Sequence, residues 1–208
     1  SVFVSVTAQC LPTVFGRGID RLLRNKFPVR QVPSLLQAGY RPSQTLLLPK
    51  EIHRLVGALH DRGERDERLF LVYGDMHEVQ EIRDCLDTGR AFGEHLKPRS
   101  FAEVLIQLLR CLPVPVIPPE IRAACMERHT SSTAVLETIS RLPPSHMTVL
   151  VYIVSFLKEI LKFSDINKLT PETLALVFGG IMMSPEKVTI GKTVVPTAGW
   201  SDLRKEQA

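Results

Sequence analysis

The sequence predicts an all-α fold, a bundle of about seven or eight helices preceded by one remnant β-strand. From about residue 49 onward, apolar residues recur at helical spacing, whereas only the first ten residues alternate with the period of a strand. Glycine and proline separate the helical segments, as is typical of helix boundaries. The chain has 208 residues, of which 44% are hydrophobic and 23% charged, so it can build one main core.

The first ten residues predict a strand with two different faces. Valines occupy one face, and the other face carries Phe3 among serines and a threonine. Because a lone strand leaves its backbone groups and its apolar face without partners, we expect it to belong to a β domain whose other strands precede this sequence. The next segment, residues 28–48, contains prolines and no sustained period, which predicts a linker.

Two amphipathic helices are predicted next. Residues 50–63 end at Gly63, and residues 75–89 lie between a capping Asp75 and a terminal Gly89. Their buried stripes are Ile52, Leu55, Val56 and Leu59 in the first helix and Val79, Ile82 and Leu86 in the second.

A third helix is predicted to begin with Ser100 as its cap and to end before the proline-rich run PVPVIPP. Its inward residues are Phe101, Val104, Leu105, Leu108 and Leu112. Two shorter helices are expected around residues 119–128 and 132–141.

The longest predicted helix, residues 145–163, is apolar almost all the way round, which predicts a central helix surrounded by others. Its apolar run is shorter than the roughly 20 residues that cross a bilayer, so we interpret it as a core helix. Thr170 is predicted to cap the next helix, with Pro171 at its first position and Leu174, Val177, Phe178 and Ile181 buried. Beyond Ser184 the period is lost, and a further helix begins only at Ser201.

No motif predicts a cofactor, a metal ion or a bound nucleotide in this chain. The letters GKT end at Thr193, but a phosphate-binding loop needs another glycine where Glu186 stands. The six histidines and four cysteines show no metal-ligand spacing, and the widely spaced cysteines fit the reduced thiols of a cytoplasmic protein. The net charge of +4 is spread over interspersed acidic and basic residues, so nucleic-acid binding is not expected.

Several runs resemble one protein family. RLFLVYG (68–74), AEVLIQLLRCLPVPVI (102–117) and TPETLALVFGGIM (170–182) resemble, in order, the motifs of the RhoGAP fold. More narrowly, VSVTAQCLPTVFGRGIDRLLR and ISRLPPSHMTVLVYIVSFLKEILKFSDIN resemble the C-terminal region of the OCRL and type II inositol polyphosphate 5-phosphatase family. In that family a phosphatidylinositol 4,5-bisphosphate 5-phosphatase domain precedes an immunoglobulin-like ASH domain and a RhoGAP-like domain. The resemblance implies an ASH remnant at 1–27, a linker at 28–48 and a RhoGAP-like domain at 49–208 with a truncated C-terminal helix.

The resemblance also implies that the catalytic groups of a GTPase-activating protein are missing. An active RhoGAP inserts an arginine into the GTPase site, which contributes about 10³ to 10⁵ in rate, and the motif alignment places Leu71 there. A lysine, an asparagine and a proline of active members correspond to Ile106, Thr173 and Gly180, and only Arg110 matches. We therefore predict a pseudo-GAP with no catalytic residue rather than an enzyme.

The partners implied by the resemblance are small GTPases. Rho-type proteins (Rac, Cdc42) and Arf are expected on the RhoGAP-like domain, and Rab on the ASH portion through Phe3, where the family has an aromatic residue. Candidate GTPase contacts are Arg68, Leu71, Tyr73 and Arg110. The family also binds adaptor peptides in a groove with a tryptophan where this chain has His53, which predicts a weaker pocket. The linker has no acidic residue, so clathrin binding is not expected.

We expect a cytoplasmic module that places a phosphoinositide 5-phosphatase on endosomal and Golgi membranes by binding GTPases without stimulating hydrolysis. Two alternatives stay open. One is an active Rho GTPase-activating protein that uses Arg68 or Arg110. The other is a peptide or lipid adaptor with no GTPase partner.

Overall fold

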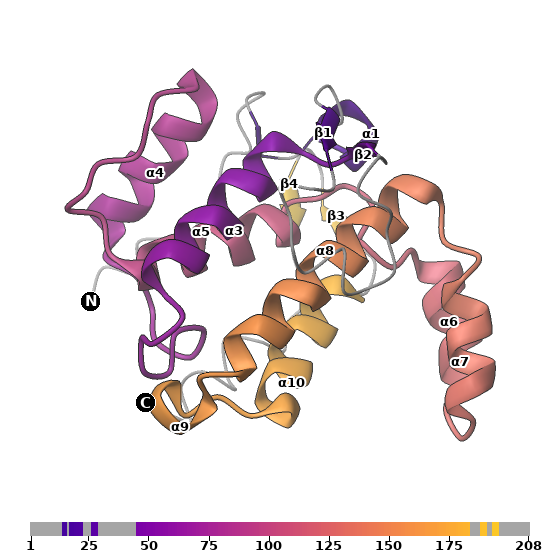
Figure 1. The fold of residues 1–208 in the computed structure, drawn as a ribbon. Coiled ribbons are helices and arrows are strands. Elements are labelled where there is room, and N and C mark those ends of the chain that lie inside the picture. The colour runs from indigo at the N-terminus through magenta and orange to yellow at the C-terminus, as the bar shows by residue number, and fades with distance from the viewer. Residues whose placement is uncertain are drawn as a thin grey trace.

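The protein is a helical bundle, as Figure 1 shows. The computed structural model describes residues 14–15, 17–22, 26–28, 45–183, 188–190 and 193–195. Within the continuous stretch 45–183 there are eight helices, which confirms the predicted all-α fold class. They are α3 (Lys50–Arg62), α4 (Met76–Thr88), α5 (Pro98–Arg110), α6 (Pro119–Glu127), α7 (Ser132–Ile139), α8 (Pro144–Leu161), α9 (Ser164–Asn167) and α10 (Pro171–Met182).

Short elements precede and follow this bundle along the chain. A single turn, α1 (Ile19–Leu22), comes before β1 (Lys26–Pro28), which pairs antiparallel with β2 (Thr45–Leu47). After α10, β3 (Val188–Ile190) pairs antiparallel with β4 (Thr193–Val195). The sequence did not predict these four strands, because three residues are too few to show an alternating pattern. The strand predicted at residues 1–10, with Phe3, lies outside the described residues.

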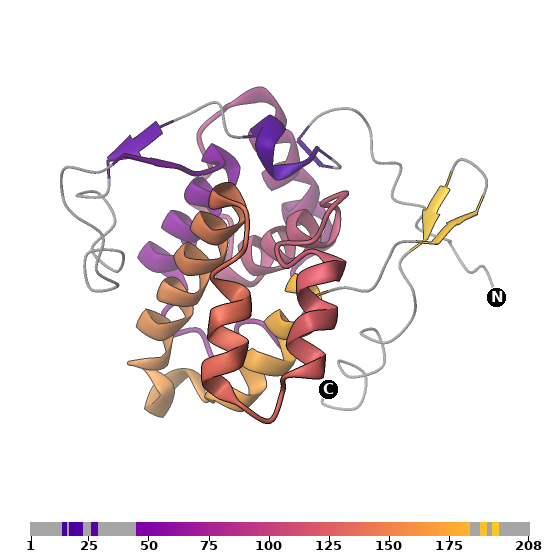
Figure 2. The same cartoon turned by 90° about the vertical axis from the view of Figure 1, so that its right-hand side faces the viewer.

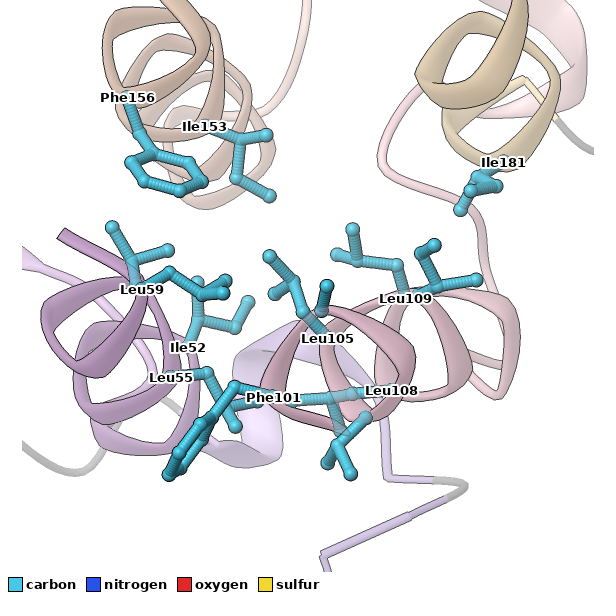
Figure 3. Packing of buried hydrophobic residues seen from close by; sticks show 14 of the residues in the cluster. Ile52, Leu55, Leu59, Phe101, Leu105, Leu108, Leu109, Ile153, Phe156 and Ile181 are labelled. Carbon is cyan, nitrogen blue, oxygen red and sulfur yellow. The ribbon is translucent and has the colours of Figure 1, made fainter. Parts of the chain in front are cut away.

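Helix α5 lies at the centre of the bundle. It packs against α3, α4 and α10. Its residues Leu105 and Leu109 lie among side chains of α3, α8 and α10 (Figure 3). Figure 3 also shows Ile153 and Phe156 of α8 facing Leu59 of α3. Each fully buried aliphatic or aromatic side chain stabilises the fold by roughly 1.5–3 kcal/mol, so these facing stripes hold the bundle together.

Local signals in the sequence located most helix ends correctly. The Asp75 side chain accepts hydrogen bonds from the first-turn N–H groups of α4, and Gly89 ends that helix with φ 74°. Thr170 caps α10 as predicted, with Pro171 at the first position. The predicted cap at Ser100 is wrong. Helix α5 begins two residues earlier at Pro98, because the fixed φ of proline suits the first helical position.

Helix α8 packs against α3 on one side and lines an open groove with α7 and α10 on the other, so other helices surround it in part. It is 18 residues long and, by length and composition alone, apolar enough to cross a membrane, but half of it is buried inside the bundle. On the other side, Leu150 and Val151 are half-buried and Val154 is 43% exposed. Helices α6 and α7 pack on each other, and α7 lies beside this side of α8 in Figure 2. The apolar circumference of α8 therefore includes a face that the described helices cover only in part.

Candidate functional site

The candidate site centres on the loop that joins α3 to α4, residues 63–75, which carries the position that the family motif gives to an arginine. Leu69 and Phe70 are completely buried, and the Phe70 ring meets Phe156 and Phe178 edge to face at centroid distances of 6.4 and 5.0 Å. Leu71 is half-buried and packs against the same core. The middle of the loop is therefore anchored in α8 and α10 by apolar contacts.

A second anchor of the loop is Asn167, at the end of α9. This side chain is fully buried, and its Nδ2 donates to the carbonyls of Glu64 and Ile160 at 2.9 Å each. Its Oδ1 accepts from the N–H of Leu169 at 3.0 Å, and its backbone carbonyl accepts from the N–H of Arg68 at 2.8 Å. Asn167 thus ties the loop to the end of α8 and the start of α10. Sequence reasoning missed it, since hydrogen bonds to residues a hundred positions away leave no local pattern.

The backbone of Arg68 has an unusual conformation that this anchor maintains. Its φ is 58°, in the left-handed region that non-glycine residues seldom occupy. Its carbonyl accepts from the N–H of Leu71 at 2.8 Å, which closes a tight turn over the two buried residues between them. The backbone of Arg68, whose side chain is half-buried, is therefore fixed by hydrogen bonds at both its N–H and its carbonyl.

The start of α5 holds the loop from the other direction. Arg99 donates from Nε to Asp66 at 2.8 Å and from Nη2 to the carbonyl of Glu67 at 3.1 Å. Gly74 lies so close to this helix that an added Cβ would come within 2.5 Å of the Cα of Ser100. The Ser100 hydroxyl donates to Glu78 at 2.7 Å and accepts from the N–H of Asp75 at 3.2 Å. Ser100 therefore joins the loop and α4 to α5 instead of capping its own helix.

The other three positions that the motif resemblance aligns with catalytic groups lie on α5 and α10. Ile106 is buried in the core on α5, and Gly180 is half-buried on α10. The hydroxyl of Thr173 lies 3.1 Å from the hydroxyl of Thr170, and the N–H of Thr173 donates to the Thr170 hydroxyl at 3.2 Å. Thr173 therefore belongs to the cap of α10. Leu71 and Ile106 both belong to the same apolar core: Ile106 lies in it, and Leu71 packs against it.

Two predicted contact residues are exposed, at opposite ends of α5. Tyr73 is 55% exposed and precedes Gly74, which touches the first turn of α5. Arg110 is the exposed last residue of α5, and its side chain has no hydrogen bond or ion pair with any residue that the structure describes. Since a helix rises 1.5 Å per residue, the ten steps from Ser100 to Arg110 separate these ends by about 15 Å.

A polar hollow on the outer face of α3 contains His53. Its volume is about 360 Å³, and Arg54, Asp61, Arg62 and Phe92 also line it. The His53 ring stacks on Tyr152 with centroids 6.1 Å apart, and burial lowers the pKa of His53. The Arg54 guanidinium lies 4.3 Å from the Phe92 ring centroid and donates to the carbonyls of Cys85 and Arg90. His53 therefore lines a surface hollow, but its imidazole ring offers less apolar area than the indole ring of a tryptophan would.

The described residues include no group of three or more His, Cys, Asp or Glu side chains placed to hold a metal ion. The exposed side chains of the α3–α4 loop are aromatic, cationic and acidic, namely Tyr73, Arg65, Glu67 and Asp75. Such side chains can contact a protein surface.

Comparisons with known proteins place these features in a family. The RhoGAP domain model matches residues 49–187. The type II inositol 1,4,5-trisphosphate 5-phosphatase of Mus musculus is 32% identical over 193 residues, which are 87% of this chain and 19% of that protein. Rho GTPase-activating protein 24 of Mus musculus is 29% identical over 150 residues, which are 67% of this chain and 20% of that protein. The chain thus spans about one fifth of the length of these curated relatives.

Solved structures share the fold. Human Rho GTPase activating protein 15 superposes with a TM-score of 0.64 at 16% identity, covering 82% of this chain and 77% of that one. The BH domain from GRAF, the GTPase regulator associated with focal adhesion kinase, gives a TM-score of 0.59 at 19% identity, covering 68% and 80%.

Proposed function

Because this chain belongs to the RhoGAP domain family, we propose that its helical bundle binds Rho-type small GTPases without accelerating GTP hydrolysis. The observation that carries the proposal is Leu71, an aliphatic side chain packed against the core at the position of the family's arginine. A leucine cannot neutralise charge on the transferred phosphoryl group. The missing arginine corresponds to about 10³ to 10⁵ in rate, or roughly 4–7 kcal/mol of barrier.

The rival proposal, an active enzyme that uses Arg68 or Arg110, is less well supported. Arg68 lies in a turn that is held by Asn167 and by the buried Phe70, and its side chain would have to reach the nucleotide from there. Arg110 lies at the far end of α5, about 15 Å along the helix from the contact of the loop with Ser100. Either arginine would need the loop or the docked GTPase to be rearranged.

The exposed residues around α5 suit a docking surface. Tyrosine and arginine are the residue types that most often dominate interface energies, and Tyr73 and Arg110 are both exposed. A standard interface buries about 800 Å² on each partner, which is wide enough to cover both ends of α5. We propose that one GTPase contacts both residues.

Binding and hydrolysis should be measured with the same Rac and Cdc42 preparations. Titration calorimetry is expected to give saturable binding, while single-turnover GTP hydrolysis stays at the intrinsic rate, with an active RhoGAP domain as the positive control. Tyr73→Ala and Arg110→Glu should weaken binding. Arg128→Glu, a matched charge reversal at the exposed end of α6, should not. A rate increase abolished by Arg68→Ala or Arg110→Ala would favour the rival.

We further propose that the domain positions a phosphoinositide 5-phosphatase on endosomal and Golgi membranes through Rho, Arf and Rab GTPases. The identity of 32% to a type II inositol 1,4,5-trisphosphate 5-phosphatase supports this link. A fluorescent fusion of this chain should be enriched on these membranes in cells and lose enrichment when Arg110→Glu is introduced. Uniform cytoplasmic fluorescence of the unchanged fusion would contradict the proposal.

The hollow on α3 supports a second candidate function, weak binding of adaptor peptides that contain phenylalanine and histidine. His53 lies in this hollow beside two arginines. Because a larger ring would add apolar contact area, His53→Trp is expected to tighten binding of such a peptide in calorimetry. Unmeasurable binding by both the unchanged chain and the variant would exclude this function.

A further inference from the structure

The hairpin of α6 and α7 ends in a turn that is exposed throughout. Every residue from Met126 to Thr133 is exposed. Helices α6 and α7 pack on each other, and Figure 1 shows their connecting turn pointing away from α3, α4 and α5. Ser131 belongs to this turn and is itself exposed, so a second protein can reach it.

The hydrogen bonds that shape the turn are local. The N–H of Arg128 donates to the carbonyl of Cys125 at 3.2 Å, and the N–H of Ser131 donates to the carbonyl of Arg128 at 3.0 Å. Nδ1 of His129 lies 2.8 Å from the carbonyl of Met126. Since each of these contacts joins residues three positions apart, the turn can open without disturbing the core of the bundle.

The sequence around Ser131 carries a charge pattern that protein kinases recognise. Arg128 stands three residues before Ser131, and no other arginine in the sequence has a serine or threonine at that distance after it. Kinases select substrates partly by such charge patterns, and an arginine here suits a kinase whose substrate groove carries carboxylates. Lys97 likewise precedes Ser100 by three residues, but Ser100 is only 1% exposed and donates to Glu78. Sequence pattern and exposure therefore select the same hydroxyl, that of Ser131.

The surroundings of Ser131 also suit a phosphate. Ser131 is the cap of α7, and its side-chain oxygen accepts from the N–H of Ala134 at 3.3 Å. Phosphate oxygens are strong acceptors, and negative charge is favourable at the start of a helix. The cationic side chain of Arg128 lies in the same turn and can form charge-assisted hydrogen bonds to a phosphate. Phosphorylation is therefore expected to strengthen the start of α7.

We propose that Ser131 is a phosphorylation site for an arginine-directed protein kinase that uses ATP. The Oγ of Ser131 forms a bond to the γ-phosphorus of ATP while the bond between that phosphorus and the bridging oxygen of ADP breaks. The hydroxyl proton passes to a base of the kinase, and ADP leaves. A neutral hydroxyl is thereby replaced by a group of charge about −1.5 to −2. The proposal does not depend on GTPase binding, because neither Tyr73 nor Arg110 takes part in it.

Phosphorylation of the purified 208-residue protein tests the proposal. The probe is the kinase domain of a calmodulin-dependent protein kinase, an arginine-directed enzyme, with ATP. Mass spectrometry of the peptides should find a single phosphate, on Ser131. Ser131→Ala should abolish the incorporation, whereas Ser132→Ala, the same change at the exposed neighbouring serine, should retain it. Arg128→Ala should lower kcat/KM for phosphorylation several-fold while the circular dichroism spectrum stays unchanged.

Nuclear magnetic resonance of the phosphorylated protein tests the environment of the phosphate. The amide proton of Ala134 should move downfield and exchange several-fold more slowly than in the unmodified protein. Equal shift and exchange in the two forms would overturn the assignment of the phosphate to the cap of α7. Absence of phosphate from Ser131, its appearance on Thr130 or Ser132 instead, or incorporation that Arg128→Ala leaves unchanged would overturn the phosphorylation site itself.

Discussion

At the scale of single residues, we propose that Leu71 allows docking of a GTPase but not catalysis. We predict that Leu71→Arg alone leaves the hydrolysis rate of Rac or Cdc42 at its intrinsic value. The new guanidinium would lack the lysine and asparagine found in active members, because Ile106 is buried in the core and the hydroxyl of Thr173 serves the cap of α10. Single-turnover GTP hydrolysis checks this.

Leu71→Met is the control for that experiment, since it keeps an apolar side chain of similar volume at the same place. Both variants should retain the circular dichroism spectrum of the unchanged domain. A large rate increase with Leu71→Arg would show that the other replaced positions do not limit activity.

Glu51 gives the folding stability a pH dependence with a defined sign. Burial raises its pKa above the ordinary 4.5, against smaller opposing effects of a backbone hydrogen bond and of Lys50, Arg54 and Arg17. Its Oε2 is buried without a hydrogen-bond partner among the described residues. Between the ordinary and the raised pKa the folded state keeps a proton that the unfolded state has released. Stability contributed by the protonated form is therefore lost as pH rises through this window.

Glu51→Gln removes this titration. The fall in the free energy of unfolding from acid to neutral pH should be smaller in the variant, as measured by urea denaturation over a pH series. Asp61→Asn, on the exposed part of the same helix, should leave the pH dependence unchanged. An equal pH dependence in Glu51→Gln and the unchanged chain would contradict the assignment.

The sequence predicted residue roles well where the cause is local. The caps at Asp75 and Thr170 follow from side chains that bond to N–H groups two or three positions away. It failed at Ser100, where Pro98 competes for the helix start and the hydroxyl bonds to Glu78 instead. Motif alignment gave Leu71 its place, but the packing of Leu71 depends on contacts that no local pattern encodes.

At the scale of elements, the α3–α4 loop depends on α9. We predict that Asn167→Ala lowers the free energy of unfolding by at least about 2 kcal/mol, because it leaves the buried N–H of Leu169 without its partner and removes the bonds from Nδ2 to the carbonyls of Glu64 and Ile160. Urea denaturation measures the loss. Asp165→Ala, an exposed substitution on the same helix, should change stability by less than about 0.5 kcal/mol.

Hydrogen exchange provides a local measure of the same effect. The amides of Arg68 and Leu71 should exchange faster in Asn167→Ala than in Asp165→Ala, since the loop loses its tie to α9. Unchanged exchange at both amides would mean that Phe70 and Arg99 hold the loop without Asn167.

The existence and order of the helices followed from the periodicity of the sequence, because each helix buries an apolar stripe. The partial exposure of α8 did not follow. An apolar circumference shows that a helix avoids water on all sides, but it does not say whether neighbouring helices or another segment provide the cover. The short strand pairs were also unpredictable, since β1 and β2 meet across sixteen intervening residues.

At the scale of the whole molecule, the RhoGAP bundle has a packed core and an anchored α3–α4 loop, and we propose that it lacks the groups for phosphoryl chemistry. The loop is anchored from α5, α8 and α9, which preserves the shape that a GTPase would meet. Shape and exposed contact residues govern docking, whereas hydrolysis needs a charge at one point of that surface. A RhoGAP domain can therefore lose the ability to stimulate hydrolysis and still dock on a GTPase.

The most direct test measures binding and hydrolysis on one sample of Rac with this domain at saturating concentration. We predict a saturable calorimetric signal that Arg110→Glu weakens, together with a GTP hydrolysis rate equal to that of Rac alone. Hydrolysis that accelerates in proportion to the bound fraction would contradict it.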